Sequence, residues 1–162
     1  MEEQLRPLAH QGGQCTPRAL MMGLKIIDHQ AFAELEVRLM ACDDGLGKVF
    51  GACSRSRVVL QRHRVSTEDL SSLSNALVED GQHCLFKYGA LVFDPDDGST
   101  GSFEDFAKDR DAREKLVAAS VRVFRTEAEA TAYKQQEKKK RKQRAQQEEQ
   151  QRKRKKAASG AP

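Results

Sequence analysis

The chain has no tryptophan, few other aromatic residues, few cysteines and no long apolar run. Its nine Phe and Tyr residues all precede residue 134. A segment without large apolar side chains cannot build a hydrophobic core. Ordered packing is therefore expected only in the first 133 residues, a length that fits one ordinary domain.

The four cysteines stand at irregular spacings and form no Cys-x-x-Cys pair. They are Cys15, Cys42, Cys53 and Cys84. This pattern excludes a disulfide framework and a zinc ribbon, and it predicts reduced thiols in an intracellular protein.

No apolar run is long enough for a membrane span. The longest early run, residues 19–27, is interrupted by Gly23 and Lys25, whereas a spanning helix needs about 20 apolar residues. The acidic and polar start of the chain does not have the pattern of a signal or transit peptide. We therefore expect a soluble protein of the cytosol or nucleus.

A strongly basic segment, residues 134–156, is the most distinctive feature of the chain. It holds twelve Lys and Arg against three Glu, which leaves 16 basic and 21 acidic residues for the rest. A mildly acidic body with a basic arm predicts a polyanionic partner: nucleic acid, an acidic protein surface or an anionic membrane. The arm has no apolar face and no lipidation motif, so we expect no membrane partner.

The composition divides the chain into three segments. We expect a disordered lead over residues 1–15, a globular domain over residues 16–133 and a basic low-complexity arm over residues 134–162. The domain is predicted to be α+β, with a small, mostly antiparallel sheet of four or five strands and helices on one face. The arm is predicted to be a long basic helix or a disordered tail.

Several segments have the pattern of strands. Leu35, Val37 and Leu39 alternate with charged residues, which is typical of a half-buried strand, and a turn sequence at residues 43–45 would join it to a partner. The expected strands cover residues 34–41, 48–52, 57–65, 83–93 and 121–124, and residues 83–93 can form one strand or two joined at Gly89.

Helix starts are indicated by capping residues. Thr16 before Pro17 predicts a helix to about residue 27. Ser66, Ser102 and Thr126 each have an acid three residues later, as in a capping box. The helix after Ser66 is expected to bury Leu70, Leu73, Leu77 and Val78 and to end at Gly81, and the one after Ser102 to carry Phe103, Phe106, Leu116 and Val117 inward. The helix after Thr126 runs into the arm.

The acidic loop at residues 94–105 resembles a calcium-binding loop only superficially. With Gly98 at the glycine position, Phe93 and Pro95 take places that require oxygen ligands. The loop is therefore interpreted as a surface turn that leads to a capped helix.

Catalytic and metal-binding patterns are weak. If their strands were neighbours, Cys53, His63, His83 and Cys84 would approach one another as a metal or thiol site. Zinc ligands usually come in close local pairs, so buried cysteines and surface histidines are the preferred interpretation. We assign no catalytic residue, no metal and no cofactor, and an enzyme that uses these four residues remains an alternative.

The arm contains two clusters of five basic residues. They are Lys138, Lys139, Lys140, Arg141 and Lys142, and Arg152, Lys153, Arg154, Lys155 and Lys156. Each cluster resembles a nuclear localisation signal. On a helix the two clusters would face nearly the same way about 21 Å apart, a spacing that suits contacts to nucleic-acid phosphates. No aromatic residue follows Tyr133, so the arm has no platform for base recognition.

These observations predict a non-enzymatic nuclear or nucleolar adaptor. Its body would bind a protein partner, and its arm would serve as a localisation signal and bind nucleic-acid backbone, with RNA preferred. The alternative is a cytosolic or cytoskeletal adaptor whose arm binds an acidic protein surface, such as the tails of tubulin. A solvated helix that only keeps the protein soluble is the simplest reading of the arm.

Overall fold

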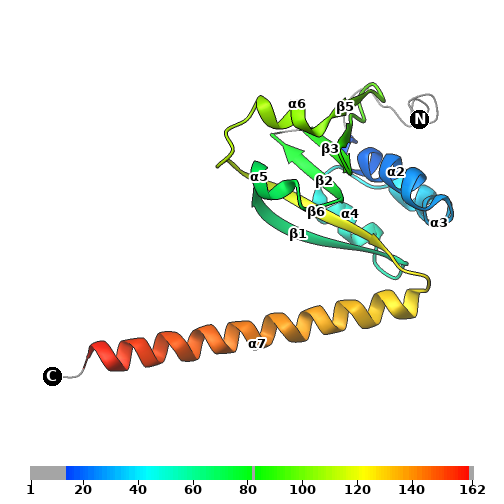
Figure 1. Ribbon diagram of the computed structural model, residues 1–162. Helices are drawn as coiled ribbons and strands as arrows, with labels where there is room; N and C mark the ends of the chain where they lie inside the picture. Colours follow the sequence, from blue (N-terminus) through cyan, green and yellow to red (C-terminus); the bar gives the residue numbers. More distant parts are fainter. Residues whose placement is uncertain (1–13, 82, 161–162) are drawn as a thin grey trace.

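A six-stranded antiparallel sheet forms the centre of the protein. The computed structural model describes residues 14–81 and 83–160. The strands run in the order β1-β6-β2-β3-β4-β5 (Figure 1). They are β1 (Val58–Ser66), β2 (Asn75–Asp80), β3 (His83–Tyr88), β4 (Leu91–Phe93), β5 (Thr100–Ser102) and β6 (Lys115–Val123).

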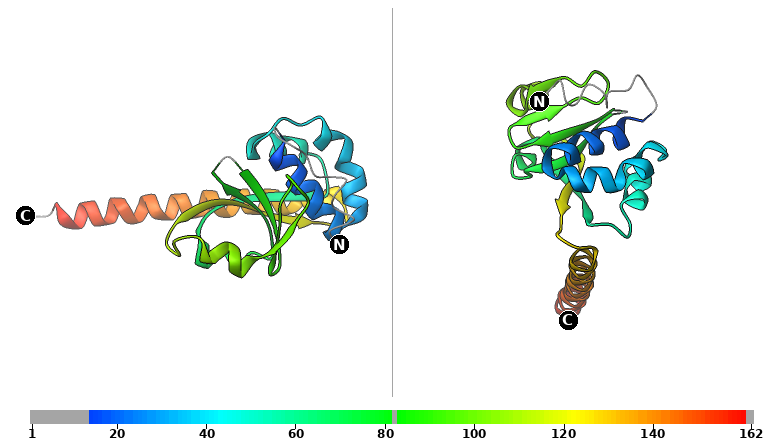
Figure 2. Two further views of the ribbon diagram at one scale, coloured as in Figure 1. Left: turned by 90° about the horizontal axis from the view of Figure 1, so that it is seen from above. Right: turned by 90° about the vertical axis from the view of Figure 1, so that its right-hand side faces the viewer.

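Helices lie on both faces of the sheet. In the described chain they are α2 (Cys15–Ile27), α3 (His29–Met40), α4 (Leu46–Ala52), α5 (Thr67–Leu70), α6 (Phe103–Lys108) and α7 (Glu127–Ser159). The first three gather on one face, and α7 leaves the end of β6 as a long rod (Figure 2). This arrangement confirms the α+β class. The sheet has six strands where four or five were expected. The expectation of helices on one face only is wrong, because the short helices α5 and α6 contact the second face.

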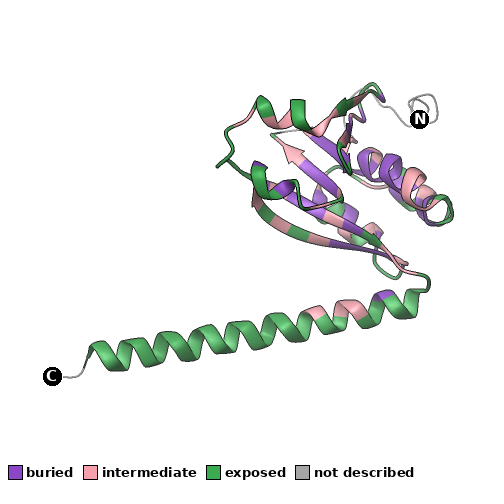
Figure 3. Cartoon of the chain, in the orientation of Figure 1, coloured by how far each residue is buried: buried purple, intermediate pink, exposed green. Residues whose placement is uncertain are grey.

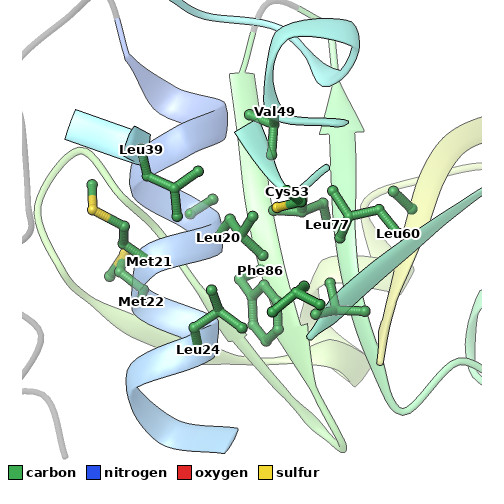
Figure 4. Packing of buried hydrophobic residues seen from close by; sticks show 14 of the residues in the cluster. Leu20, Met21, Met22, Leu24, Leu39, Val49, Cys53, Leu60, Leu77 and Phe86 are labelled. Carbon is green, nitrogen blue, oxygen red and sulfur yellow. The ribbon is translucent and has the colours of Figure 1, made fainter. Parts of the chain in front are cut away.

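The main core lies between the sheet and α2. Leu20 and Leu24 are one helical turn apart and face Phe86 of β3, with Leu77 of β2 beside it (Figure 4). All four side chains are completely buried. The helix α3 packs against α2, and the two methionines of α2, Met21 and Met22, are also completely buried (Figure 4). The helix α2 is therefore enclosed between two layers.

Gly23 allows α2 to approach the sheet closely. A Cβ atom at this position would lie 2.2 Å from the ring of Phe86. Such a contact is far inside van der Waals distance, so the glycine is needed for packing rather than for a special backbone angle.

A smaller core fills part of the opposite face. Its buried members come from α5, β2 and β6, namely Leu70, Ala76, Val78, Leu116 and Ala118. Beside it, the buried Lys87 donates from Nζ to the carbonyl oxygens of Leu73 (2.6 Å) and Gly89 (2.8 Å). Burial lowers the pKa of Lys87, and the two hydrogen bonds compensate for part of the lost hydration.

The prediction of a strand over residues 34–41 is wrong, because residues 34–40 belong to α3 and Ala41 is its C-cap. Leu35 and Leu39 are buried at a four-residue spacing, while Val37 between them is 79% exposed. A spacing of four residues between Leu35 and Leu39 fits a helix, and it also fits a strand when the residue between them is apolar. Because Val37 is apolar, the sequence showed the alternation of a strand. The helix begins after Asp28, whose side chain accepts a hydrogen bond from the Ala31 amide.

The strand expected over residues 48–52 is also wrong. These residues lie in α4, where Leu46 and Val49 are buried three residues apart. The hairpin expected between residues 34–41 and 48–52 is therefore absent, and these residues lie in the helices α3 and α4.

The cap at Ser66 is confirmed, but the length of its helix is not. Ser66 accepts a hydrogen bond from the Asp69 amide (3.1 Å), and α5 ends one residue later at Leu70. Leu77 and Val78 lie instead in β2, where they face opposite sides of the sheet.

The helix after Ser102 is likewise shorter than expected. Ser102 accepts from the Asp105 amide (3.0 Å), and α6 ends at Lys108. Leu116 and Val117 belong to β6, which is longer than the strand expected over residues 121–124.

Two further strand predictions are confirmed. The strand at residues 57–65 is β1, and residues 83–93 form β3 and β4 on either side of Gly89, whose φ is 56°. The first helix ends at Ile27 as expected, but the cap predicted at Thr16 is wrong: Gln14 occupies the cap position without a side-chain hydrogen bond, and Thr16 lies inside the helix. The lead expected over residues 1–15 falls almost wholly outside the described residues.

Replacing Asp28 with alanine is expected to lower the free energy of unfolding by about 1 kcal/mol at neutral pH, because α3 loses its cap. The Ala31 amide and nearby Arg57 outweigh burial and hold the pKa of Asp28 below its usual value of 3.8. A carboxyl whose pKa is lowered by folding stabilises the protein above the unfolded pKa, and this contribution is lost as pH falls through the folded one. Urea unfolding of the variant and parent should therefore converge below about pH 4. The exposed Asp43→Ala serves as control; an equal effect of both substitutions would contradict the capping role.

Candidate nucleic-acid interface

The basic arm is part of one continuous helix. The 33-residue α7 begins after Thr126, whose hydroxyl accepts a hydrogen bond from the Glu129 amide (3.2 Å). This confirms the cap predicted at Thr126. No glycine or proline interrupts the helix before Gly160, and Gln, Glu, Lys and Arg favour helix formation. The sequence had left a helix and a disordered tail as alternatives, and the structure has the helix.

The first two turns of α7 attach it to the sheet. Ala130 is buried, and Tyr133 lies against Phe124, with ring centroids 5.1 Å apart. The guanidinium of Arg122 lies 4.8 Å from the Phe124 ring and 5.0 Å from the Tyr133 ring. The Tyr133 hydroxyl also reaches Gln61 of β1 at 3.5 Å. These contacts fix the direction in which the helix leaves the body.

A small hollow of about 220 Å³ separates the next turns of α7 from β1. Its lining comes from both elements and from α4, and includes Phe50, Gln61, Arg62, Lys134, Glu137 and Arg141. Arg62 lies 5.8 Å from the centre of the Phe50 ring. The root of the arm therefore combines cationic, polar and aromatic side chains, a group that sequence reasoning missed because β1 and α7 are distant in the chain.

The two basic clusters face solvent, and of their residues only Arg141 also lines this hollow. Every residue of α7 from Lys138 onward is exposed (Figure 3). The ten cluster residues are Lys138, Lys139, Lys140, Arg141, Lys142, Arg152, Lys153, Arg154, Lys155 and Lys156. The helix keeps the two clusters 14 positions apart, or about 21 Å.

Little of this charge is neutralised within the described part of the chain. Lys140 pairs with Glu137 (3.0 Å) and Lys153 with Glu149 (2.7 Å), both along the helix surface. No ion pair among the described residues joins either cluster to a carboxylate of the body. Exposed ion pairs of this kind contribute little to stability, and salt screens them further. The clusters therefore remain available to an external anion.

The four residues considered as a thiol or metal site do not come together. His63 is hydrogen-bonded to Ser120 (3.0 Å) on β6, and His83 to Asp94 (2.9 Å). Cys53 and Cys84 are buried among apolar side chains, and burial raises the pKa of each thiol to about 12. Both thiols are thus protonated at neutral pH and poor nucleophiles.

His83 has other neighbours that sequence reasoning did not identify. Of all His, Cys, Asp and Glu side chains at residues 14–81 and 83–160, only those of Cys15, His83 and Asp96 form a group that could hold a metal ion. Their positions in the chain are far apart, and no spacing pattern links them.

Comparison with protein-family models, curated proteins and solved structures finds no match. Within the part of the chain that the structure describes, no helix has the length and apolar character of a membrane span.

Proposed function

We propose that the protein is a non-enzymatic nuclear or nucleolar adaptor whose helix α7 binds the phosphate backbone of nucleic acid, RNA in particular, and acts as a nuclear localisation signal. The observation that supports this is the exposure of both basic clusters on a helix with almost no internal neutralisation. A dense cationic helix binds polyanions by releasing their counterions, which needs no base recognition.

The length of the helix suits this role. Its 33 residues extend about 50 Å, and the stretch from Lys138 to Lys156, which holds both clusters, accounts for about 27 Å of that length. Successive phosphates of one backbone can therefore meet both clusters. The body, which has a small excess of acidic residues outside the arm, does not compete for the same partner.

The body is proposed to bind a protein. The outer face of α3 exposes two large apolar side chains three residues apart, Val37 at 79% and Met40 at 49%. Residues at this spacing share one helix face. We assign the protein contact to this face, and Val37→Glu with Met40→Glu should remove it.

Localisation tests the proposal in cells. A fluorescently tagged chain should accumulate in the nucleus, and removal of residues 134–162 should return it to the cytosol. A variant with glutamine at the ten cluster residues should behave like the truncated chain. A control carries glutamine at five exposed basic residues of the body and should stay nuclear; its change in net charge equals that of losing one cluster. The five residues are Lys48, Arg64, Lys108, Arg113 and Lys115.

A cross-linked pull-down with and without nuclease identifies the partner of α7. Under the proposal, RNA co-purifies with the full chain, and nuclease removes the molecules that are captured through the arm. The proposal would be contradicted if the full chain stayed in the cytosol and still captured acidic proteins through α7 after nuclease treatment. That result would favour the cytoskeletal alternative.

A further inference from the structure

Three side chains that are common metal ligands converge at one end of the sheet. Cys15 opens α2, His83 opens β3, and Asp96 belongs to the turn between β4 and β5. One potential ligand atom from each lies within 4.8 Å of the other two. This group is remote in sequence from α7 and plays no part in the function proposed above.

Asp96 turns one carboxylate oxygen toward each of the other two residues. Its Oδ1 lies 3.6 Å from Cys15 Sγ, and its Oδ2 lies 3.7 Å from His83 Nδ1. Bond lengths of about 2.0 Å to nitrogen or oxygen and about 2.3 Å to sulfur place tetrahedral zinc ligands about 3.3 to 3.5 Å apart. The two distances to Asp96 are within about 0.4 Å of this spacing, and the ligand atoms of Cys15 and His83 lie within 4.8 Å of each other.

The opposite nitrogen of the imidazole is already held. His83 Nε2 is hydrogen-bonded to Asp94 Oδ1 at 2.9 Å, and the same oxygen accepts the Asp96 amide at 2.8 Å. A carboxylate behind a histidine is the usual companion of a metal-binding imidazole, because it orients the ring and leaves the other nitrogen lone pair toward the ion. Here that nitrogen is Nδ1, which faces Asp96.

We propose that Cys15, His83 and Asp96 bind a divalent transition-metal ion of the zinc class, with Asp94 as the carboxylate that orients His83. A thiolate, an imidazole and a carboxylate together suit zinc and cobalt better than magnesium or calcium, which prefer oxygen ligands. The Asp96 side chain is 52% exposed, so solvent occupies the fourth position.

Binding would tie together the start of α2, the start of β3 and the β4–β5 turn. A ligand that binds only the folded protein stabilises it by mass action. We therefore expect the ion to raise the midpoint of thermal unfolding.

Cobalt titration of the full chain tests the site. One equivalent of Co²⁺ should give a thiolate-to-metal charge-transfer band and the visible bands of a tetrahedral complex, and Zn²⁺ should displace them. Cys15→Ser should abolish the charge-transfer band, and Asp96→Asn, on an exposed turn, should weaken binding without affecting the fold. Asp94→Asn should weaken binding about 10- to 100-fold, since it replaces the carboxylate that orients His83 and keeps an amide oxygen that can accept from the Asp96 amide.

Cys42→Ser is the matched control, because Cys42 is also a half-buried thiol beside an aspartate but lacks a histidine partner. It should leave the cobalt spectrum and the thermal shift unchanged. A titration without a charge-transfer band, or one that Cys42→Ser changes as much as Cys15→Ser does, would overturn the proposal. Circular dichroism confirms that each variant folds.

Discussion

Glutamine at all ten cluster residues of α7 is expected to weaken binding to single-stranded RNA about a thousandfold at 0.15 M salt. Five consecutive residues span more than one helical turn, so about three of the five in each cluster can face one backbone. The slope of log affinity against log salt should then be about −4 for the parent, about −2 after loss of either cluster and near zero after loss of both. Fluorescence anisotropy with a uridine homopolymer at several salt concentrations measures both the affinity and this slope.

The control variant carries glutamine at Lys48, Arg64, Lys108, Arg113 and Lys115, five exposed basic residues of the body. It changes the net charge as much as loss of one cluster does. Its affinity and salt slope should stay close to those of the parent, because the charge must lie along the helix to matter. A drop as large as that of a one-cluster variant would mean that net charge, rather than the arm, governs binding. An adenosine homopolymer should bind as tightly as the uridine one, since phosphate contacts carry no sequence information.

Gly23→Ala is expected to lower the free energy of unfolding by about 1–3 kcal/mol, although alanine favours helix by about 1 kcal/mol over glycine. The added Cβ would meet the completely buried Phe86 ring at 2.2 Å. Neither α2 nor β3 can move away, because α3 holds α2 from the outer side. Urea and thermal unfolding should show the loss, with a midpoint lower by about 5–15 °C.

Gly51→Ala provides the matched comparison. Gly51 also lies in a helix, but a Cβ there meets no atom within 4 Å. That variant should be as stable as the parent or more so. In a Phe86→Leu background, Gly23→Ala should lose most of its cost, because the outer ring atoms that it meets are gone. Equal stability of the two glycine variants in the parent would show that Gly23 is not pressed against the ring.

Features that depend on local chemistry were predictable from the sequence. The caps at Ser66, Ser102 and Thr126 each accept the amide hydrogen bond expected three residues later. The arm forms a helix for the same reason, since its residues favour helix and none breaks it. The α+β class was predictable because the capped helices and the strands β1, β3 and β4 carry clear local signals.

Apart from the ambiguous period of residues 34–41, the predictions that were wrong or missing concern contacts between segments distant in the chain. Leu77 and Val78 continue a helical stripe from Leu70, but β6 offers them a strand partner and each is buried on its own face of the sheet. The β-propensity of a segment does not tell which other segment will pair with it as a strand. The Cys15 and Asp96 contact, 81 residues apart, was invisible for the same reason. In the candidate interface, the clusters were predictable and their anchor at Tyr133 was not.

The arrangement of charges around α7 determines how many polyanionic strands one molecule can bind. Each cluster surrounds the helix, so no single side of the rod is reserved for a partner. Two polyanionic strands can then be bridged along opposite sides of one molecule. Mixtures should become turbid when positive and negative charges are balanced, and clear again when either component is in excess.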